Sequence, residues 1–328
     1  MNDPFGRRID YLRLSVTDRC NLRCVYCLPE DYAGFSRRDE TLADDEIVVL
    51  AERFAELGFS KIRVTGGEPL VRPGLPGLIG RLSAISGVTE ISMSTNGILL
   101  APMAKDLARA GLNRVNISLD TLDAAKFAEI TRFGTLTAVM EGIAAAAHAG
   151  LDPIKLNVVV VRGVNDGELA DFAELARERP VHVRFIELMP MGETGFFSAE
   201  RLVPMAEILG RLGSLEVLPQ QNWPAGNGPA RYFQAPGAKG TVGIISAMSC
   251  TFCGTCNRVR LSAKGALVPC LDGADGTDLA AMLRAGASPE DLRRAIESVI
   301  RRKPERHFML EKAQSREENP RFMCQIGG

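Results

Sequence analysis

The hydrophobic and polar positions of the chain follow two alternating patterns over its first two thirds. Between Ile9 and about Leu188, short runs rich in β-branched residues are each followed by a longer stretch with apolar residues at helical spacing. The short runs predict strands at Tyr11–Val16, Lys61–Thr65, Glu90–Ser94, Arg114–Ser118, Ile154–Val160 and Val181–Glu187. The longer stretches predict helices, among them Asp44–Leu57, Ala101–Ala110, Leu136–Ala149 and Glu168–Arg177. Regular alternation of strand and helix predicts a parallel sheet with right-handed crossovers.

Six strand–helix units fall short of the eight in a closed barrel, so we expect a partial (β/α)6 barrel of the TIM type. The alternative is an open, doubly wound sheet. Four polar motifs favour the barrel, because each follows the carboxyl end of a predicted strand, where a β/α barrel builds its active site. These motifs are Thr65–Glu68, Ser94–Gly97, Ser118–Asp120 and Glu187–Gly192.

The alternation ends after about Glu193. Residues 219–242 are rich in Pro, Gly, Asn and Gln, which favours irregular structure and short strands. Further on, Pro289–Ile300 has the pattern of a helix, with Ser288 as its N-cap. The sequence thus predicts an α/β fold in two parts: a partial barrel over residues 1–210 and a smaller α+β part over residues 211–328 that carries a second metal site.

Composition and charge narrow the functional classes. Hydrophobic residues make up 46% of the 328 residues, and the net charge of -1 gives no bulk electrostatic reason to expect nucleic acid or a membrane as a partner. The arginine-rich run at 293–306 is interrupted by Glu297 and Glu305, which indicates a solvated helix face. No apolar stretch approaches the roughly 20 residues that cross a bilayer, and residues 1–10 lack the apolar stretch of a secretory signal. We therefore expect a cytoplasmic protein whose cysteines stay reduced.

Seven of the eight cysteines fall into two groups that are far apart in the sequence. The first group, Cys20, Cys24 and Cys27, has a CxxxCxxC spacing and follows the first predicted strand. Three thiolates can bind three irons of a [4Fe–4S] cluster and leave the fourth iron open for another ligand. Zinc is the alternative, but a structural zinc site takes four ligands and no nearby Cys or His completes this set.

This arrangement resembles the radical S-adenosylmethionine superfamily. The resemblance extends to Tyr26 within the cysteine loop and, in order, to Gly66–Pro69, Ser118 and Met189 at later strand ends. It implies that the first cysteine group holds a cluster that cleaves S-adenosylmethionine. It also implies that the backbone at Gly67 approaches the methionine amine and that Tyr26 and Met189 pack against the adenine. Ser118 would contact the methionine or the ribose.

The second group contains Cys253 and Cys256, followed by Cys270 fourteen residues after Cys256. Its spacing alone leaves three alternatives open. These are a second cluster with an open iron, a four-thiolate zinc site closed by Cys250, and a fully ligated electron-transfer cluster.

Basic residues near these cysteines and on the predicted strands indicate an anionic substrate. Arg258 and Arg260 share one face of an extended segment, and two fixed guanidinium groups suit a phosphate or a carboxylate. Arg13, Arg63 and Lys155 lie on predicted barrel strands, where an unpaired charge is costly to bury. If these side chains point into the barrel, an anion is their natural partner.

Nearly end to end, the chain resembles the radical S-adenosylmethionine enzymes that act on GTP in the first step of molybdenum-cofactor biosynthesis. The narrowest match is Phe252–Leu261, together with Cys270 and the terminal Gly327-Gly328. The resemblance implies a lyase that converts GTP into 3′,8-cyclo-7,8-dihydro-GTP and holds a second [4Fe–4S] cluster, whose open iron binds the guanine. Its ligands would be Cys253, Cys256 and Cys270. The residues implied to bind GTP are Arg13, Arg63, Ser94, Lys155, Arg258 and Arg260, with Lys61 and Arg184 as further candidates for the triphosphate.

The same resemblance implies several partners. They are an electron donor and a downstream cyclic pyranopterin monophosphate synthase, and a homodimer is compatible with it. The Gly-Gly tail would reach into the active site. Two other functions stay open at this point: a radical enzyme with an auxiliary cluster that acts on another substrate such as a peptide, and a non-catalytic electron-transfer or zinc protein.

Overall fold

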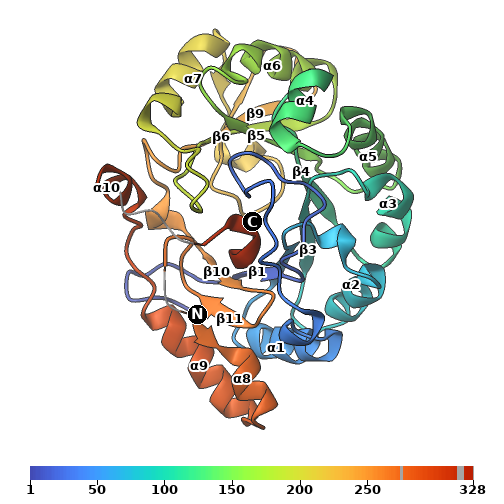
Figure 1. Cartoon of the computed structure of the whole chain (residues 1–328), viewed down its shortest axis with the longest axis vertical. Coiled ribbons are helices and arrows are strands. Elements are labelled where there is room, and N and C mark those ends of the chain that lie inside the picture. Colours follow the sequence, from blue (N-terminus) through green and yellow to red (C-terminus); the bar gives the residue numbers. More distant parts are fainter. Residues whose placement is uncertain (274–275, 316–320, 328) are drawn as a thin grey trace.

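A computed structural model describes residues 1–273, 276–315 and 321–327. Within these ranges the strands form one 12-stranded sheet in the order β12-β11-β10-β1-β2-β3-β4-β5-β6-β9-β8-β7. Figure 1 looks along the axis of a curved arrangement, with the strands in the middle and the helices around them. The C-terminal end of the chain lies near the centre of this view.

The elements have the following bounds. The strands are β1 (Tyr11–Ser15), β2 (Lys61–Thr65), β3 (Glu90–Thr95), β4 (Arg114–Ser118), β5 (Lys155–Val160), β6 (His182–Glu187), β7 (Glu216–Val217), β8 (Arg231–Gln234), β9 (Thr241–Ile245), β10 (Arg258–Leu261), β11 (Ala266–Val268) and β12 (Thr277–Asp278). The α-helices are α1 (Asp44–Glu56), α2 (Leu75–Ser83), α3 (Leu100–Arg109), α4 (Ala124–Thr131), α5 (Leu136–His148), α6 (Leu169–Glu178), α7 (Met205–Leu212), α8 (Leu279–Arg284), α9 (Pro289–Arg301), α10 (Met309–Gln314) and α11 (Met323–Ile326).

The six predicted strands are β1 to β6, and their ends agree with the prediction to within one residue. The same holds for the five predicted helices, α1, α3, α5, α6 and α9. Neighbouring strands from β1 to β6 are parallel, as the strand–helix alternation predicts. The partial barrel of the α/β class is therefore confirmed.

Two further parallel strands come from the C-terminal part of the chain. β10 pairs with β1 and β9 pairs with β6, so eight consecutive strands are parallel. β11 and β12 continue one edge in antiparallel fashion, and β8 and β7 continue the other. The sheet begins at β12 and ends at β7, so the barrel is open between its two edges. The division at residue 210 stays a prediction.

The helix ends follow local sequence signals. Glycines 58, 111 and 150 have φ between 75° and 101° and follow the C-cap residues of α1, α3 and α5, a conformation that suits glycine at a helix end. Ser288 caps α9, and its hydroxyl oxygen accepts a hydrogen bond from the amide of Asp291. No helix in the described ranges is both long and apolar enough to cross a membrane.

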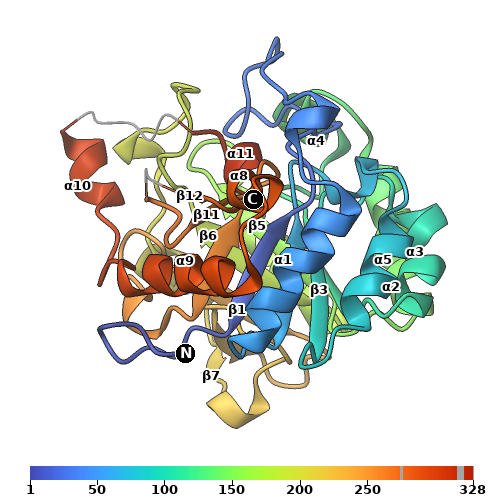
Figure 2. The ribbon, with the colours of Figure 1, turned by 90° about the horizontal axis from the view of Figure 1, so that it is seen from below.

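Helix α9 carries the first part of the arginine-rich run on its exposed side. Arg293 pairs with Glu290 of the same helix and with Glu56 of α1, and Arg294 also pairs with Glu290. Figure 2 shows α9 running across the outside of the molecule, with α1 beside it. These charges are therefore matched locally on a solvated face.

The two faces of the barrel strands differ sharply in polarity. Outward side chains such as Leu12, Ile62 and Val115 are buried in one large hydrophobic core with the surrounding helices. Because side chains alternate along a strand, the intervening residues point into the barrel. From β1 to β4 these inward residues are Tyr11, Arg13, Ser15, Lys61, Arg63, Thr65, Glu90, Ser92, Ser94, Arg114, Asn116 and Ser118. Polar side chains of this kind can bind a ligand inside the barrel, whereas a packed core would require apolar side chains there.

Candidate active site

The predicted substrate-binding residues meet inside the barrel. Arg13 lies opposite Arg63 in the β1–β2 register and opposite Arg260 in the β1–β10 register. Lys155 lies opposite Asn116, and Asn116 lies opposite Ser94. Arg258 begins the strand that ends beyond Arg260. The register therefore gathers the predicted residues from five strands that span most of the chain.

This interior carries far more positive than negative charge. In the part of the chain that the structure describes, Glu90 is the only carboxylate that forms an ion pair with an inward cation, and its partner is Arg114 (Nε to Oε1 3.0 Å). Burial lowers the pKa of Arg63 and of Arg260 to about 10, and burial together with the charges of Arg260 and Arg63 lowers the pKa of Arg13 well below its ordinary value. Arginine still stays protonated at neutral pH. The barrel thus holds a positive field that a bound polyanion would neutralise.

The positive charges of the barrel interior also act on Lys155, which can lose its proton near neutral pH. It is 1% exposed. Burial, followed by the charges of Arg184 and Arg114, lowers its pKa to about 6. Its Nζ donates to the carbonyls of Pro224 (3.3 Å) and Ala225 (2.6 Å). At neutral pH Lys155 is therefore mainly uncharged until an anion approaches it.

The C-terminal tail reaches into the barrel, as predicted. The carbonyl oxygen of Gly327 accepts hydrogen bonds from Arg260 (Nη1, 3.0 Å) and from Arg13 (Nη2, 3.3 Å). Gly327 has φ +77°, and a Cβ there would lie 2.8 Å from Thr65 Oγ1. Glycine is thus required for the tail to fit. Gly328, the last predicted tail residue, lies outside the described residues.

The loop that carries the first cysteine group packs against the glycine pair after β2. A Cβ at Gly66 would lie 2.6 Å from the Thr17 carbonyl, and one at Gly67 would lie 2.5 Å from the Arg19 carbonyl. The amide of Gly67 donates to the carbonyl of Thr17 (2.8 Å). The glycine pair therefore allows two backbones to touch beside Cys20. This close approach fits the expected S-adenosylmethionine site.

The three thiols of this loop are free and partly buried. Burial raises the pKa of Cys20 to about 11, and burial followed by the neighbouring Cys27 raises the pKa of Cys24 well above its ordinary value. The described part of the chain contains no group of three or more Cys, His, Asp or Glu side chains positioned to hold a metal ion. The three cysteines therefore share one loop and stay neutral thiols, but they are not drawn together as metal ligands are. Their donor chemistry suits an iron–sulfur cluster, and binding it would release protons.

Tyr26 is held in place by Asp120 at the end of β4. The Tyr26 hydroxyl donates to Asp120 Oδ2 (2.5 Å), while Oδ1 accepts from the amide of Val159 (2.8 Å). Ser118 is exposed at the end of β4. Met189 packs against a small hydrophobic cluster that includes Ile326 of the tail. The expected cofactor-binding side chains therefore all lie at the carboxyl ends of the strands.

Glu68 joins the ends of β2 and β3 and was not singled out as a site residue from the sequence. Its carboxylate accepts hydrogen bonds from Thr95 Oγ1 (2.7 Å), the Asn96 amide (2.7 Å) and the Leu70 amide (3.0 Å). Asn96 in turn donates to Asn21 in the cysteine loop (2.8 Å). Burial raises the pKa of Glu68 to about 7. The sequence signal was its place in the Gly-Gly-Glu-Pro motif.

Two buried cations hold the second cysteine group. Arg7 donates to the carbonyls of Cys253 (2.8 Å) and Pro304 (2.7 Å), and Lys303 donates to those of Arg258 (2.9 Å) and Pro269 (2.6 Å). Neither contact was predicted, because the partners are far apart in sequence.

Cys256 differs from the cysteines of the first group in its electrostatic surroundings. Burial favours the neutral thiol, but the charges of Arg258 and Lys303 outweigh it and lower the pKa of Cys256 to about 6. Cys253 is buried at the start of the short 3-10 helix Cys253–Thr255, and Cys270 lies after β11. The second group therefore contains a thiolate at neutral pH before any metal binds.

Glu187 connects the barrel with the loop that leads to the second cysteine group. It is fully buried at the end of β6. Its carboxylate accepts hydrogen bonds from the amides of Met248 (2.7 Å) and Ser249 (2.8 Å) and also from the Ser249 hydroxyl. Glu187 therefore positions residues 246–250 beside Met189.

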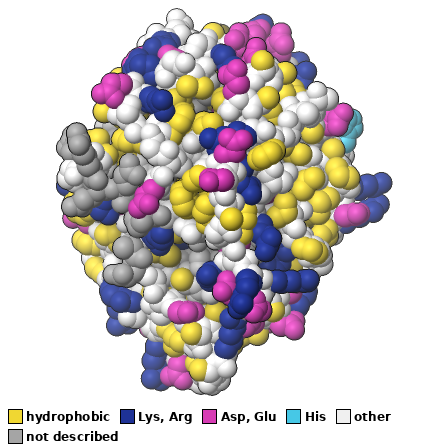
Figure 3. Space-filling model, viewed as in Figure 1, with side chains coloured by type: hydrophobic (Ala, Val, Ile, Leu, Met, Phe, Trp, Pro, Cys, Tyr) yellow, Lys and Arg dark blue, Asp and Glu magenta, His cyan; other side chains and the backbone are white. Residues whose placement is uncertain are grey.

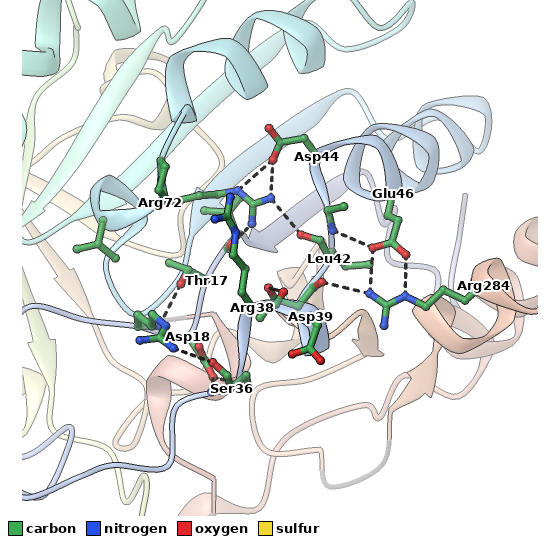
Figure 4. A pocket seen from close by; sticks show the side chains of 16 residues that line it. Thr17, Asp18, Ser36, Arg38, Asp39, Leu42, Asp44, Glu46, Arg72 and Arg284 are labelled. Carbon is green, nitrogen blue, oxygen red and sulfur yellow. Dashed lines mark hydrogen bonds and ion pairs between the residues drawn. The ribbon is translucent and has the colours of Figure 1, made fainter.

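A cavity of about 850 Å³ lies beside the first cysteine loop, outside the barrel interior. Four of its charged side chains form ion pairs, as Figure 4 shows: Arg72 with Asp44 (Nη2 to Oδ1 2.5 Å) and Arg284 with Glu46 (Nε to Oε1 2.7 Å). Figure 3 likewise shows acidic and basic side chains interspersed over the face viewed in Figure 1. In contrast to the barrel interior, this cavity is lined by carboxylates as well as by basic side chains.

Comparison with known proteins agrees with this geometry. Residues 14–176 match the Radical SAM superfamily, and residues 181–309 match the family described as Molybdenum Cofactor Synthesis C. Among solved structures, Streptococcus suis SuiB bound to its precursor peptide is similar over 97% of this chain and 75% of its own, with a TM-score of 0.63 and 12% identity. Methylornithine synthase (PylB) is similar over 63% of both chains, with a TM-score of 0.50 and 17% identity. At these identities the structures show a shared fold.

Curated relatives match the chain over its whole length. The GTP 3′,8-cyclase of Pelotomaculum thermopropionicum is 49% identical over 100% of both chains. Those of Moorella thermoacetica and Desulforamulus reducens are 48% and 47% identical, again over 100% of both chains. The chain belongs to the GTP 3′,8-cyclase family of the radical SAM superfamily.

Proposed function

We propose that this chain converts GTP into 3′,8-cyclo-7,8-dihydro-GTP with S-adenosylmethionine, the first step of molybdenum-cofactor biosynthesis. Family membership supports the reaction, since the curated relatives carry the name GTP 3′,8-cyclase. One observation carries the substrate class: the barrel gathers basic side chains from many strands and balances them with one paired carboxylate in the described residues. A nucleoside triphosphate supplies the missing negative charge.

Cys20, Cys24 and Cys27 would hold the first [4Fe–4S] cluster, whose open iron would take S-adenosylmethionine. When reduced, the bound cluster supplies a 5′-deoxyadenosyl radical from S-adenosylmethionine. Gly67 would offer its backbone to the methionine amine. Tyr26, fixed by Asp120, would pack against the adenine.

Two further residues would complete the cofactor site. Ser118 would contact the methionine or the ribose, and Met189 would pack on the adenine from the end of β6. Both lie at the same edge of the sheet as Tyr26. This shared edge would hold the radical source above the barrel interior.

The barrel would hold GTP with its triphosphate among the basic residues. Arg13, Arg63 and Lys155 would bind the phosphates, with Ser94 beside them, and Arg258 and Arg260 would hold the nucleotide near the second cysteine group. Cys253, Cys256 and Cys270 would hold the second [4Fe–4S] cluster, whose open iron would bind the guanine. This placement would present the ribose C3′ hydrogen to the radical and keep C8 within reach of C3′.

The C3′ hydrogen of GTP would pass to the 5′-deoxyadenosyl radical, which would leave as 5′-deoxyadenosine. The resulting C3′ radical would bond to C8 at the expense of the C8–N7 double bond, and one further electron and one proton at N7 would complete the dihydro ring. An electron is also consumed in cleaving S-adenosylmethionine, so the proposal includes a one-electron donor as partner. The protein would exclude water from the radical.

The proposal extends to the surroundings of the enzyme. A downstream cyclic pyranopterin monophosphate synthase would consume the product. The eight cysteines are all free, which suits the reducing cytoplasm. The homodimer stays a prediction.

The test is an anaerobic assay of the protein with reconstituted clusters, reductant, S-adenosylmethionine and GTP, analysed by mass spectrometry. We expect 5′-deoxyadenosine and a cyclised GTP product. If 5′-deoxyadenosine formed while GTP stayed intact, the substrate would be wrong and a peptide substrate would gain ground. Absence of both products from a protein with intact, reduced clusters would favour an electron-transfer or zinc protein.

A matched pair of cysteine variants tests the assignment of the second cluster. Cys250→Ala should keep cyclase activity and the full iron content, whereas Cys253→Ala should lose the product and the iron of one cluster. Equal losses in both variants would overturn the assignment in favour of a four-thiolate site.

A further inference from the structure

The amino ends of β4, β5 and β6 are closed by a loop from the C-terminal part of the chain. This floor loop comprises residues 223–228 and follows β7. Its carbonyls at Pro224 and Ala225 accept the two hydrogen bonds of Lys155 Nζ. Figure 2 shows β7 and the chain beside it at the end of the molecule opposite α11. The barrel therefore has a mouth at the cysteine loops and a floor at residues 223–228.

The floor loop touches three cations on three neighbouring strands. A Cβ at Gly226 would lie 2.8 Å from Arg114 Nη2 and 3.1 Å from Lys155 Nζ. A Cβ at Gly228 would lie 3.4 Å from Arg184 Nη1. Gly226 has φ +128°, a conformation that residues with a side chain rarely adopt. Glycine at position 226 is therefore what lets the loop lie directly against these charges.

Several hydrogen-bond donors near this floor have no partner. Arg114 Nη1, Arg184 Nε and Arg63 Nε are buried and make no hydrogen bond within the described ranges. Arg114 and Arg184 are each 2% exposed. Lys155 in its charged form has three hydrogens, of which the floor loop takes two. Buried donors without acceptors are costly, and an anion in the barrel interior would supply acceptors.

The position of these donors fits one part of the proposed substrate. The cysteine loops fix the radical source and the guanine at the mouth, whereas Arg114 lies four residues below Ser118 on β4, a depth of about 13 Å. A ribose and three phosphates can span this depth, and a single phosphate cannot. The end of the phosphate chain also carries the highest charge.

We propose that Arg114 and the floor loop form the subsite of the terminal phosphate and so select a nucleoside triphosphate over shorter nucleotides. The inference rests on the proposed function and adds a substrate-binding residue and a specificity-determining loop to it. Arg114 offers its free Nη1 to the phosphate while Glu90 holds the rest of the guanidinium. The floor loop sets how deep the phosphate chain can reach.

The test compares the affinities of GTP and GMP by calorimetry on the anaerobically reconstituted protein. Gly226→Ala adds a methyl group to the floor loop on the side of Arg114 and Lys155. It should lower the affinity for GTP at least tenfold while changing the affinity for GMP less than twofold. Gly237→Ala is the matched control, because Gly237 also has positive φ (+71°) but has no heavy atom within 4 Å of the added Cβ. It should leave both affinities as they are. Parallel losses of GTP and GMP affinity in Gly226→Ala would overturn the inference.

Arg114 is tested without leaving a buried charge unpaired. The double variant Arg114→Gln/Glu90→Gln should lose most of the preference for GTP over GMP, whereas Glu90→Gln alone should bind GTP more tightly because the competing carboxylate is gone. Circular dichroism melting checks that both variants fold. A double variant with the wild-type preference would overturn the role of Arg114.

Inorganic tripolyphosphate separates this inference from the proposed function. Wild-type protein that binds tripolyphosphate, with a loss in Gly226→Ala, supports the subsite even if GTP is not the substrate. If the wild-type protein bound GTP no more tightly than GMP, the proposed terminal-phosphate subsite would be wrong. The proposed cyclase reaction could still be right.

Discussion

At the scale of single residues, the two cysteine groups are prepared for metal in different ways. Burial raises the pKa of Cys20 to about 11, so its thiol stays protonated at neutral pH. For Cys256 burial acts in the same direction, but Arg258 and Lys303 outweigh it and bring the pKa to about 6. Only the thiolate binds metal and attacks electrophiles. Two basic side chains therefore decide which group is reactive before a cluster is present.

This difference predicts a selective reaction of the iron-free protein. At pH 7 and without oxygen, iodoacetamide should modify Cys256 much faster than Cys20, although both are partly exposed. The rate at Cys256 should fall as the pH is lowered through about 6, because the thiolate is lost there. Peptide mapping by mass spectrometry measures both rates.

Lys303→Met supplies the control for this reaction. Removing the ammonium group raises the pKa of Cys256 towards that of a buried thiol, so its modification at pH 7 should slow while that of Cys20 stays the same. Equal rates at Cys20 and Cys256 in the wild type would contradict the electrostatic explanation.

At the scale of elements, the N-terminal segment acts as a clamp on the second cysteine group. Arg7 pairs with Asp3 (Nε to Oδ2 2.5 Å) and donates to three carbonyls, those of Cys253, Pro304 and Glu305. These contacts join the first residues of the chain to the loop before β10 and to the segment after α9. A single buried guanidinium thereby ties together three segments that no sheet pairing connects.

Replacing Arg7 by Met should therefore destabilise the protein by about 3 kcal/mol, because Asp3 is left buried without its partner and three carbonyls lose a donor. Arg8→Met is the neighbouring control. The Arg8 side chain is 76% exposed, and its ion pair with Asp10 is long (Nε to Oδ2 3.6 Å). Its loss should therefore lower the free energy of unfolding by less than about 0.5 kcal/mol. Urea unfolding followed by circular dichroism compares the two. Similar unfolding midpoints would show that the clamp is not stabilising.

The elements that could be predicted from sequence are those with a repeated local pattern. β1 to β6 were found because outward Leu, Ile and Val alternate with inward polar residues such as Arg13 and Arg63. β7 and β12 have two residues each and carry no such pattern. The placement of β10 beside β1 depends on pairing across most of the chain, and local sequence does not encode it.

The same distinction holds within the site. The cysteines and the arginines of the second group were recognised from their spacing, and Arg13, Arg63 and Lys155 from their places on predicted strands. Arg114 lies on a predicted strand with the same alternation but was not singled out, because its partner Glu90 and the floor loop come from other elements. Contacts between distant segments require the folded chain.

At the scale of the whole molecule, the basic side chains in the barrel interior repel one another, and a bound anion would reduce this repulsion. Lys155 sits at the centre of this effect because it can lose its charge. Burial and the charges of Arg184 and Arg114 hold its pKa at about 6, whereas a bound triphosphate would return it towards the ordinary value. The free protein is therefore mainly neutral at Lys155 above pH 6, and the complex is protonated there.

This change predicts that binding of GTP at pH 8 takes up a proton, on the order of one per site, because the phosphate itself is already fully ionised at that pH. Affinity should accordingly fall as the pH rises above about 6. Calorimetry in HEPES and in Tris measures the uptake, since the two buffers differ in ionisation enthalpy. Lys155→Met should bind without uptake, and identical enthalpies of the wild type in both buffers would contradict the prediction.

The pairing of β10 with β1 also has a consequence for the chain while it is being translated. Synthesis runs from the amino end, so β1 leaves the ribosome long before residues 258–261, which pair with one edge of it. An uncovered edge strand invites pairing with other chains. Until β10 has been synthesised, β1 therefore has an unpaired edge. We expect chains that stop before β10 to aggregate through this edge.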